Sequence, residues 1–140
     1  MHIDSDSLTS CNQAIVRLKP KLCIAFSGGL DSTVLLHYYL LFCKQHQLKP
    51  PQAIHINHGL AKDANNWAKH CLQCCQSWAI ECSVQSVTIT HPTTNIEAQA
   101  RKARYDALSQ WMQPHHVLLT AHHLDDQIEN IISCLLYTSD

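Results

Sequence analysis

The chain contains 140 residues, carries a formal net charge of −1 and has eight cysteines. Its length is sufficient for one domain with a hydrophobic core. The charge excludes a strongly basic nucleic-acid-binding tail, although it leaves room for a local basic patch. The apolar stretches are only a few residues long, so we expect no membrane-spanning segment. The first twenty residues lack the basic start and apolar centre of a signal peptide, and we therefore expect a cytoplasmic protein whose cysteines are free thiols.

Helical and strand patterns alternate along the chain. In chain order, the apolar spacing predicts a helix over 5–18, a strand over 21–26, a helix over 31–45, a strand over 51–58, a helix over 63–79, a strand over 81–89, a helix over 95–112, a strand over 116–120 and a helix over 124–136. This alternation is typical of an α/β fold, with a mostly parallel sheet and helices on both faces. Ligands bind such sheets beyond the carboxyl ends of the strands, which places residues 27–32, 57–60 and 121–123 at one edge.

The helix predicted over 63–79 has an apolar stripe with the spacing i, i+4, i+7, i+11, made by Trp67, Cys71, Cys74 and Trp78. Cysteine on such a stripe behaves as a small buried hydrophobe, which favours a core role. A zinc or iron–sulfur site that adds His70 and Cys75 is the alternative. It is disfavoured because the sequence has no second Cys-x-x-Cys pair to complete it.

The helix predicted over 95–112 has the strongest pattern, with a stripe made by Ile96, Ala100, Ala103, Ala107 and Trp111. Thr94 and Glu97 predict a capping box at its start. Arg101 and Arg104 lie three residues apart beside the stripe, so both can extend towards one ligand. The alternative is a solvated basic face on which Arg101 pairs with Glu97.

Residues 27–32 read Ser-Gly-Gly-Leu-Asp-Ser and join an apolar strand to a helix. Gly28 and Gly29 allow the backbone to approach an anion closely and to adopt positive φ. The following helix directs its free N–H groups and positive dipole end at that anion, and the two serines add hydroxyl donors. Asp31 fits beside phosphate when Mg²⁺ lies between them, or it caps the helix. A plain glycine turn with a capping aspartate is the alternative, since the Walker A and dinucleotide patterns are absent.

This hexapeptide resembles the pyrophosphate loop of the N-type ATP pyrophosphatases, or PP-loop enzymes, whose pattern is Ser-Gly-Gly-x-Asp-Ser. These enzymes cleave ATP between the α and β phosphates and transfer AMP to an oxygen of the substrate. A nucleophile then displaces the AMP. The resemblance implies a Rossmann-like HUP fold, with ATP as a substrate and Mg²⁺ as its companion.

Three further stretches, residues 55–60, 95–108 and 120–130, narrow the resemblance. In this order they resemble the catalytic domain of the bacterial tRNA(Ile)-lysidine synthetase family, over roughly residues 20–136. That family adenylates the C2 oxygen of the wobble cytidine of a minor isoleucine tRNA with a CAU anticodon. The amine of free lysine then replaces AMP and yields lysidine. The implied partners are this tRNA and L-lysine, the implied location is the bacterial cytoplasm without a membrane, and a homodimer is left open.

The same resemblance implies roles for individual residues. Arg101 or Arg104, His122 and Glu129 would serve adenylation and lysine attack, with His122 near the phosphates and Glu129 near the lysine amine or a metal. His58, at the end of the second strand, would lie near ATP, whereas His55 is expected to be an ordinary buried histidine. Asp31 would also organise Mg²⁺. The loop that would hold ATP consists of Ser27, Gly28, Gly29, Leu30, Asp31 and Ser32.

Two other functions stay open on the sequence alone. Related PP-loop enzymes 2-thiolate tRNA and use cysteines, and nucleotide-binding stress proteins of related fold bind ATP without chemistry. The acid-rich stretch 121–130 argues against a pure binding module. The resemblance ends at Tyr137, where the family has an Arg-Gly-Ser-Gly type segment, and the family continues into tRNA-binding domains. We therefore expect residues 1–140 to form a single, incomplete PP-loop domain without those domains.

Overall fold

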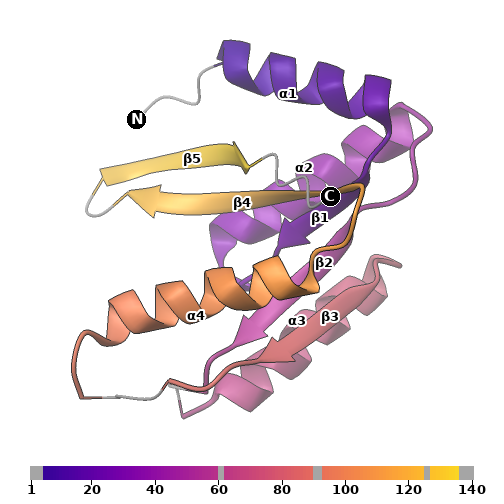
Figure 1. The fold of residues 1–140 in the computed structure, drawn as a ribbon. Coiled ribbons are helices and arrows are strands. Elements are labelled where there is room, and N and C mark those ends of the chain that lie inside the picture. Colours follow the sequence, from indigo (N-terminus) through magenta and orange to yellow (C-terminus); the bar gives the residue numbers. More distant parts are fainter. Residues whose placement is uncertain (1–4, 60–61, 90–92, 125–126, 136–140) are drawn as a thin grey trace.

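The computed structural model describes residues 5–59, 62–89, 93–124 and 127–135, and it describes side chains for 9–59, 62–89 and 93–121. Within these ranges no helix is long and apolar enough to cross a membrane. Helices and strands alternate from α1 to β4 (Figure 1). Their order is α1 (Ser5–Leu18), β1 (Lys21–Ala25), α2 (Leu30–Gln45), β2 (Gln52–Asn57), α3 (Ala64–Ser77), β3 (Cys82–Ser86), α4 (Ile96–Trp111), β4 (His116–Leu124) and β5 (Gln127–Leu135).

The strands form one sheet in the order β3-β2-β1-β4-β5, which confirms the predicted mostly parallel sheet. β1 pairs in parallel with β2 and β4, for example Cys23 with Gln52 and Leu22 with Val117, and β2 pairs in parallel with β3. The chain moves outward from β1 to β3 and then returns through α4 to β4 on the other side of β1. The strand order therefore reverses between β1 and β4, and open α/β sheets bind ligands at such a switch point.

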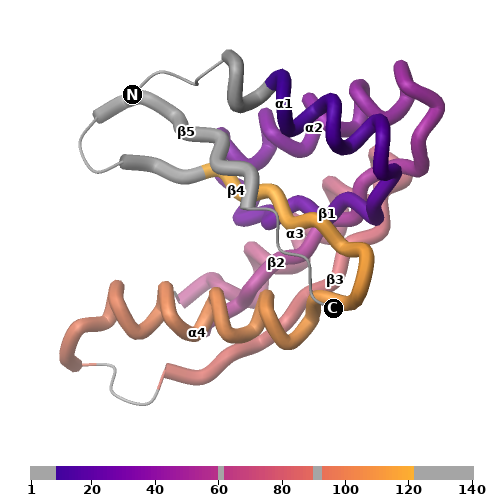
Figure 2. Tube along the Cα trace, turned by 45° about the horizontal axis from the view of Figure 1, so that its top comes forward, coloured from indigo at the N-terminus to yellow at the C-terminus, as the bar shows by residue number. Residues whose placement is uncertain are grey.

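Side chains alternate along β1 and divide the core into two parts. Leu22 and Ile24 belong to the larger cluster, which also contains buried side chains of α1, α2 and α3. Cys23 belongs to the other cluster, where it packs with Ile54 of β2 and Leu108 of α4. Figure 2 shows α4 on the opposite side of the sheet from α2 and α3. The prediction of helices on both faces is therefore confirmed.

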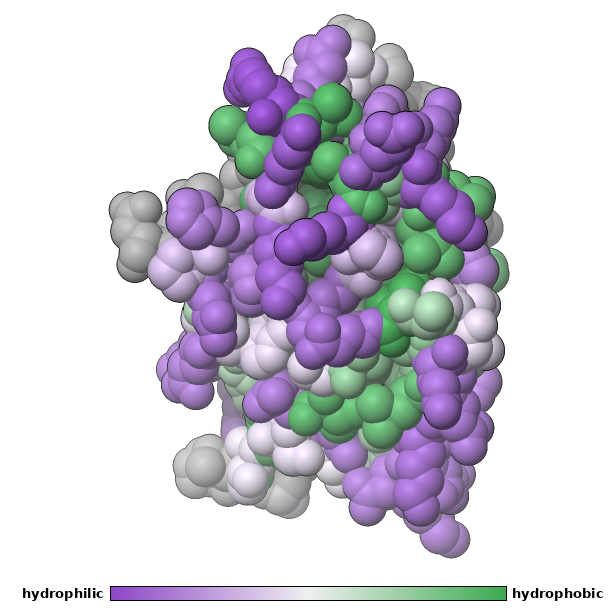
Figure 3. Space-filling model, turned by 90° about the vertical axis from the view of Figure 1, so that its right-hand side faces the viewer, coloured by the Kyte–Doolittle hydropathy of each residue, from purple (hydrophilic) through white to green (hydrophobic). Residues whose placement is uncertain are grey.

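The helix α2 carries apolar side chains on a buried and on an exposed side. Leu30, Val34, Tyr38 and Leu41 are exposed and follow one another at helical spacing. Tyr38 also accepts a hydrogen bond at its hydroxyl from Asn12 Nδ2, at 2.9 Å. On the face shown in Figure 3, apolar surface lies in groups among polar side chains. Only part of the apolar residues that predicted this helix are therefore buried in the described core.

The predicted helix over 124–136 is wrong. β4 continues through residues 121–123, which were expected to form a loop, and ends at Leu124; residues 127–135 form β5, antiparallel to β4. The apolar spacing of this segment fits a helix, but its isoleucines are β-branched and equally suit an extended strand. Pairing with β4 also satisfies backbone groups at an edge of the sheet that would otherwise be open. Tertiary pairing therefore overrides the helical spacing.

The predicted capping box at the start of α4 is also wrong. The N-cap residue is Asn95, which has a left-handed backbone with φ 48° and makes no side-chain capping bond. This conformation turns the chain just before the helix, so Thr94 lies outside the position where its hydroxyl could cap. Instead the carbonyl of Thr94 accepts a hydrogen bond from Gln99 Nε2 (2.5 Å).

The apolar stripe of α3 is confirmed in part. Cys71 is fully buried, and Cys74 and Trp78 are half-buried against the same core. Cys75, one position further on, completes the buried side. Trp67 is 45% exposed, although the stripe predicted it in the core. The core interpretation of the cysteines therefore holds for Cys71, while Trp67 has another environment.

The cysteines are not all free thiols. Cys11 of α1 is disulfide-bonded, so the expectation was wrong at this position. The free thiols among the described side chains are Cys23, Cys43, Cys71, Cys74, Cys75 and Cys82.

Candidate functional site

The loop between β1 and α2 is closed by its two serines. Ser32 Oγ accepts a hydrogen bond from the backbone N–H of Ser27 at 3.1 Å and donates to the carbonyl of Gly29 at 3.2 Å. The hydroxyls of Ser27 and Ser32 lie 3.0 Å apart, and Ser27 Oγ accepts from the N–H of Gly29 at 3.2 Å. Because Ser32 donates to Gly29, the proton between the hydroxyls comes from Ser27. Both hydroxyl protons that the sequence assigned to phosphate are therefore used to shape the loop.

Gly28 lies against α3, and a side chain at its position would be strained. Its φ is +85°, a left-handed conformation that glycine adopts without strain. A Cβ atom placed there would lie 2.8 Å from Cys71 Sγ and 3.0 Å from the indole of Trp67. The indole Nε1 of Trp67 donates a hydrogen bond to the carbonyl of Ser27 at 2.6 Å. The first turns of α3 thus form the floor under this loop.

The N-terminus of α2 presents backbone N–H groups at the same place. Gly29 is its extended N-cap and contributes no capping side chain. The first intrahelical bond runs from the N–H of Thr33 to the carbonyl of Gly29, at 3.0 Å. The N–H groups of residues 30–32 therefore precede the first intrahelical bond, and the positive end of the helix dipole adds to them. Helix N-termini of this kind are suited to bind anions without any lysine or arginine.

Asp31 places a carboxylate in the first turn of α2, where its side chain is half-buried. A carboxylate complements the helix dipole, but it repels a phosphate bound at the same N-terminus. A divalent cation between the two removes this conflict, and Mg²⁺ prefers one or two carboxylate oxygens together with phosphate oxygens. The donor set of the loop therefore fits Mg²⁺. Leu30 is 78% exposed, so only its backbone N–H is suited to bind a ligand.

The end of β2 is tied to the same loop by a buried histidine. His55 Nδ1 lies 2.9 Å from the carbonyl of Phe26 and 3.6 Å from Cys71 Sγ. Since a carbonyl only accepts, His55 carries its proton on Nδ1. Burial lowers the pKa of His55, although the bond to Phe26 opposes this effect. His55 is therefore the buried histidine that the sequence predicted, and it connects β2 with the residue that precedes the loop.

Beyond β2 the chain turns next to α3. Asn57 donates through Nδ2 to Asn65 Oδ1 at 2.9 Å, and its own Oδ1 accepts from the N–H of Gly59 at 3.0 Å. Gly59 has φ +70° and open space around its α-carbon. His58 is half-buried between these residues. The backbone at Gly59 is therefore accessible to a ligand at this strand end.

Arg101 and Arg104 are exposed on α4, and their guanidinium carbons lie 5.8 and 5.9 Å from the ring centre of Tyr105. Both precede Leu108 by whole helical turns, so they share its side of α4. Leu108 packs against the sheet beside β1 and β2. The N-terminal half of α4 extends beyond the ends of these strands (Figures 1 and 2). The arginines therefore lie on the side of α4 that faces the sheet and its carboxyl edge.

The other two predicted catalytic residues fall in the last strand pair. His122 lies in β4 and pairs with Ile131, and Glu129 lies in β5. Their side chains are outside the described part of the chain. The predicted helix that carried Glu129 is replaced by the strand β5.

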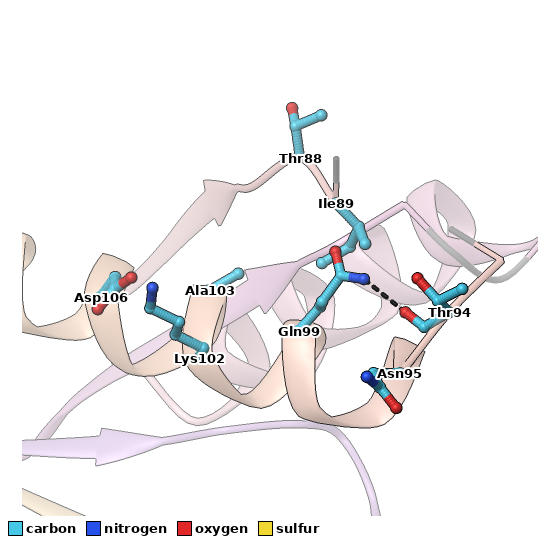
Figure 4. A pocket seen from close by; sticks show the side chains of 8 residues that line it. All are labelled: Thr88, Ile89, Thr94, Asn95, Gln99, Lys102, Ala103 and Asp106. Atoms are coloured by element: carbon cyan, nitrogen blue, oxygen red, sulfur yellow. Dashed lines mark hydrogen bonds between the residues drawn. The ribbon is translucent and has the colours of Figure 1, made fainter. Parts of the chain in front are cut away.

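A separate hollow of about 460 Å³ lies on the other side of α4 (Figure 4). With 100° per residue, the side that carries Gln99, Lys102 and Asp106 is opposite to the side that carries Leu108. None of the predicted site residues lines it. The hollow is therefore distinct from the loop site. Its lining consists of Thr88, Ile89, Thr94, Asn95, Gln99, Lys102, Ala103 and Asp106.

The sequence missed the part that Trp67 plays at the loop. The stripe of α3 indicated a core side chain, and no local pattern reveals a hydrogen bond between residues forty positions apart. Its place in the first turn of a helix that begins near the carboxyl edge of the sheet is the available signal. The loop, the end of β2 and the first turns of α3 thus form one connected site.

Known proteins resemble this chain both in sequence and in fold. The sequence pattern of the PP-loop domain, an ATP-binding family, matches residues 3–139. A tRNA(Ile)-lysidine synthase of Yersinia pseudotuberculosis is 52% identical over 115 residues, which cover 80% of this chain and 25% of that protein. One of Salmonella paratyphi B is 46% identical over 115 residues, with 82% and 27% covered. The chain spans about a quarter of the length of these relatives.

Among solved structures, the U34-tRNA thiolase NcsA of Methanococcus maripaludis, with its [4Fe-4S] cluster, is similar in fold. The TM-score is 0.51 at 19% sequence identity, and the match covers 76% of this chain and 42% of that protein. At this identity the likeness concerns the fold alone. It agrees with the α/β architecture described above.

Proposed function

Because this chain belongs to the family of ATP-binding PP-loop domains, we propose that it is the nucleotide-binding part of an enzyme that forms lysidine in tRNA. The C2 oxygen of a wobble cytidine attacks the α-phosphate of ATP, and pyrophosphate leaves. The side-chain amine of free lysine then attacks C2, and AMP leaves with the oxygen. The acceptor is a minor isoleucine tRNA with a CAU anticodon, and the reaction takes place in the bacterial cytoplasm. The identity of 46–52% with tRNA(Ile)-lysidine synthases supports this choice.

The observation that carries the proposal is the closed loop at the switch point of the sheet. The hydroxyls of its two serines are hydrogen-bonded within the loop. The donors left for pyrophosphate are therefore the backbone N–H groups at the start of α2. Asp31 would hold Mg²⁺, which would neutralise charge on the phosphates. The open backbone at Gly59 and the neighbouring His58 accommodate the adenosine end. The site thus orients ATP between the β1 and β2 ends.

The arginines of α4 supply the positive charge that this loop lacks. Attack on the α-phosphate by a weak carbonyl nucleophile builds negative charge there, and a fixed guanidinium stabilises it. Arg101 and Arg104 lie on the suitable side of α4, and we assign this role to one or both. We keep His122 for the phosphates and Glu129 for the ammonium and proton of lysine. Residues 1–140 would then form one nucleotide-binding domain within a longer protein.

A 2-thiolating enzyme is the second candidate, because the similar fold of a thiolase favours it. Such chemistry needs thiols that ionise or bind a cluster. Burial raises the pKa of Cys23 and of Cys71 to about 12. Within the described ranges, no group of three or more His, Cys, Asp and Glu side chains could hold a metal ion. The buried thiols of Cys23 and Cys71 are therefore unsuited to this chemistry, whereas a hydrogen bond with Cys75 lowers the pKa of Cys82.

The test incubates the chain with ATP, Mg²⁺, lysine and a transcript of the minor isoleucine tRNA, with the full-length Yersinia relative as a positive control. Mass spectrometry of the tRNA nucleosides should show a gain of lysine on cytidine. The gain should vanish in Asp31→Ala and persist in Asp63→Ala, which removes an acid from the start of α3 instead. Pyrophosphate release without any lysine gain would assign the chain to another acceptor. If only the relative reacts, ATP binding by this chain decides whether it is the nucleotide-binding part.

A further inference from the structure

Trp67 is placed to act on the phosphate loop (residues 27–32) rather than on the core. It is 45% exposed, and its indole N–H donates to the carbonyl of Ser27 at 2.6 Å. Its ring stacks on His70 of the same helix, with 5.0 Å between the ring centres and 27° between the planes. Because nearly half of its side chain is exposed, burial in the core does not by itself explain the orientation of Trp67.

The bond to Ser27 acts where the loop changes direction. Ser27 uses its N–H and its hydroxyl inside the loop, and its carbonyl is the remaining backbone group. The indole holds this carbonyl on the α3 side, away from the N-terminus of α2. If the peptide between Ser27 and Gly28 rotated, its carbonyl oxygen could enter the anion site and repel phosphate. The N–H of Gly28 would turn away at the same time.

The indole also limits the conformations of Gly28. Its ring carbons lie 3.0 Å from the place where a Cβ of Gly28 would be, so there is little space on that side. Glycine samples both signs of φ freely, and a loop with two adjacent glycines loses much entropy when it is fixed. A ring packed against Gly28 and a hydrogen bond to Ser27 together favour the one conformation with φ +85°. This restriction lowers the cost of ordering the loop around a ligand.

We propose that Trp67 is a positioning residue for the pyrophosphate of ATP, which it affects through the backbone of Ser27 and Gly28 without contacting the nucleotide. The inference rests on the proposed function, because it presumes that the loop binds pyrophosphate. It also gives α3 two links to the site, since Asn65 binds Asn57 at the end of β2 in the same first turn. One turn of α3 thus holds both ends of the nucleotide site.

The experiment uses the whole chain and inorganic pyrophosphate with Mg²⁺ as the probe, measured by calorimetry. Trp67→Phe keeps an aromatic ring and removes the N–H, and Trp111→Phe is the matched control in the other core cluster. Trp67→Phe should weaken pyrophosphate binding by about two- to tenfold, the effect of one hydrogen bond. Its urea midpoint should stay close to that of Trp111→Phe. Equal pyrophosphate affinities in the two variants would overturn the proposal.

A second measurement keeps the test decisive if Trp67→Phe folds poorly. The double variant W78F/W111F leaves Trp67 as the single tryptophan, since the chain has three. Pyrophosphate binding should change the fluorescence of Trp67, because the anion changes the surroundings of the loop that the indole contacts. No change upon saturation would refute the positioning role. Absence of pyrophosphate and ATP binding in the unaltered chain would instead reject the proposed function, so the two failures are distinguishable.

Discussion

Replacing Gly28 by alanine tests the packing of the loop on α3. The left-handed backbone at φ +85° costs an alanine about 1–2 kcal/mol. The new methyl group would also lie 2.8 Å from Cys71 Sγ and 3.0 Å from the Trp67 ring, both inside contact distance. Overpacking of this kind costs about 1–3 kcal/mol. Together, Gly28→Ala should lower the free energy of unfolding by about 2–5 kcal/mol.

Two other glycines provide matched controls. Gly59 has φ +70° with no atom within 4 Å of a built Cβ, so Gly59→Ala should cost only the backbone part, about 1–2 kcal/mol. Gly29 has φ −74°, and its built Cβ meets Ser27 Oγ at an ordinary 3.4 Å. Gly29→Ala should therefore be close to neutral. Urea unfolding, followed by circular dichroism, gives all three values.

Removing the sulfur in Cys71→Ala opens space for the methyl group, so Gly28→Ala should be less costly in that background. Residues in contact show coupling energies of about 0.5–3 kcal/mol in double-mutant cycles. If Gly28→Ala costs no more than Gly59→Ala, or if the two changes at positions 28 and 71 are additive, the loop does not pack on α3 as described.

Burial lowers the pKa of His55 and His116 in the folded chain, so the unfolded chain takes up these protons first as the pH falls below about 6.5. The free energy of unfolding should therefore decrease on acidification, and H55Q should flatten the decrease in urea titrations; an unchanged slope would contradict the buried neutral state. Ser32→Ala removes a hydroxyl that makes two hydrogen bonds with Ser27, so it should lower the free energy of unfolding by about 1–3 kcal/mol. It should also weaken ATP binding. If Ser32→Ala unfolds and binds ATP like the unaltered chain, the hydrogen-bonded loop is refuted. Burial raises the pKa of the Cys71 thiol to about 12, so iodoacetamide should label it only when the chain opens, which peptide mass spectrometry detects. Labelling as fast as in urea would show that the thiol is accessible.

The loop shows how far local sequence reaches. Its glycines, its acid and its place between a strand and a helix all predict an anion site, because these features depend on neighbours in the chain. The use of the serine hydroxyls was not predictable, since either phosphate or the loop itself could accept their protons. Only the distances between Ser27, Ser32 and Gly29 decide this.

For the segment 124–136, the local sequence pattern predicted the wrong structure. Its apolar residues recur at helical spacing, and this periodicity was the stronger local signal. The structure forms β5 because an open strand edge of β4 offers backbone partners to an isoleucine-rich segment. A choice between two regular structures that both fit the side chains is made by the neighbouring element, which a local pattern does not contain.

By itself, the sequence determined the alternation of strands and helices through β4, the mostly parallel α/β fold and the position of the glycine loop at a strand end. Each of these follows from the spacing of residues close in the chain. The tertiary structure alone decided that Trp67 binds the loop, that His55 meets Phe26 and that β5 closes the sheet edge. These contacts join distant residues, and their strength depends on which surfaces and backbone groups the rest of the fold leaves open.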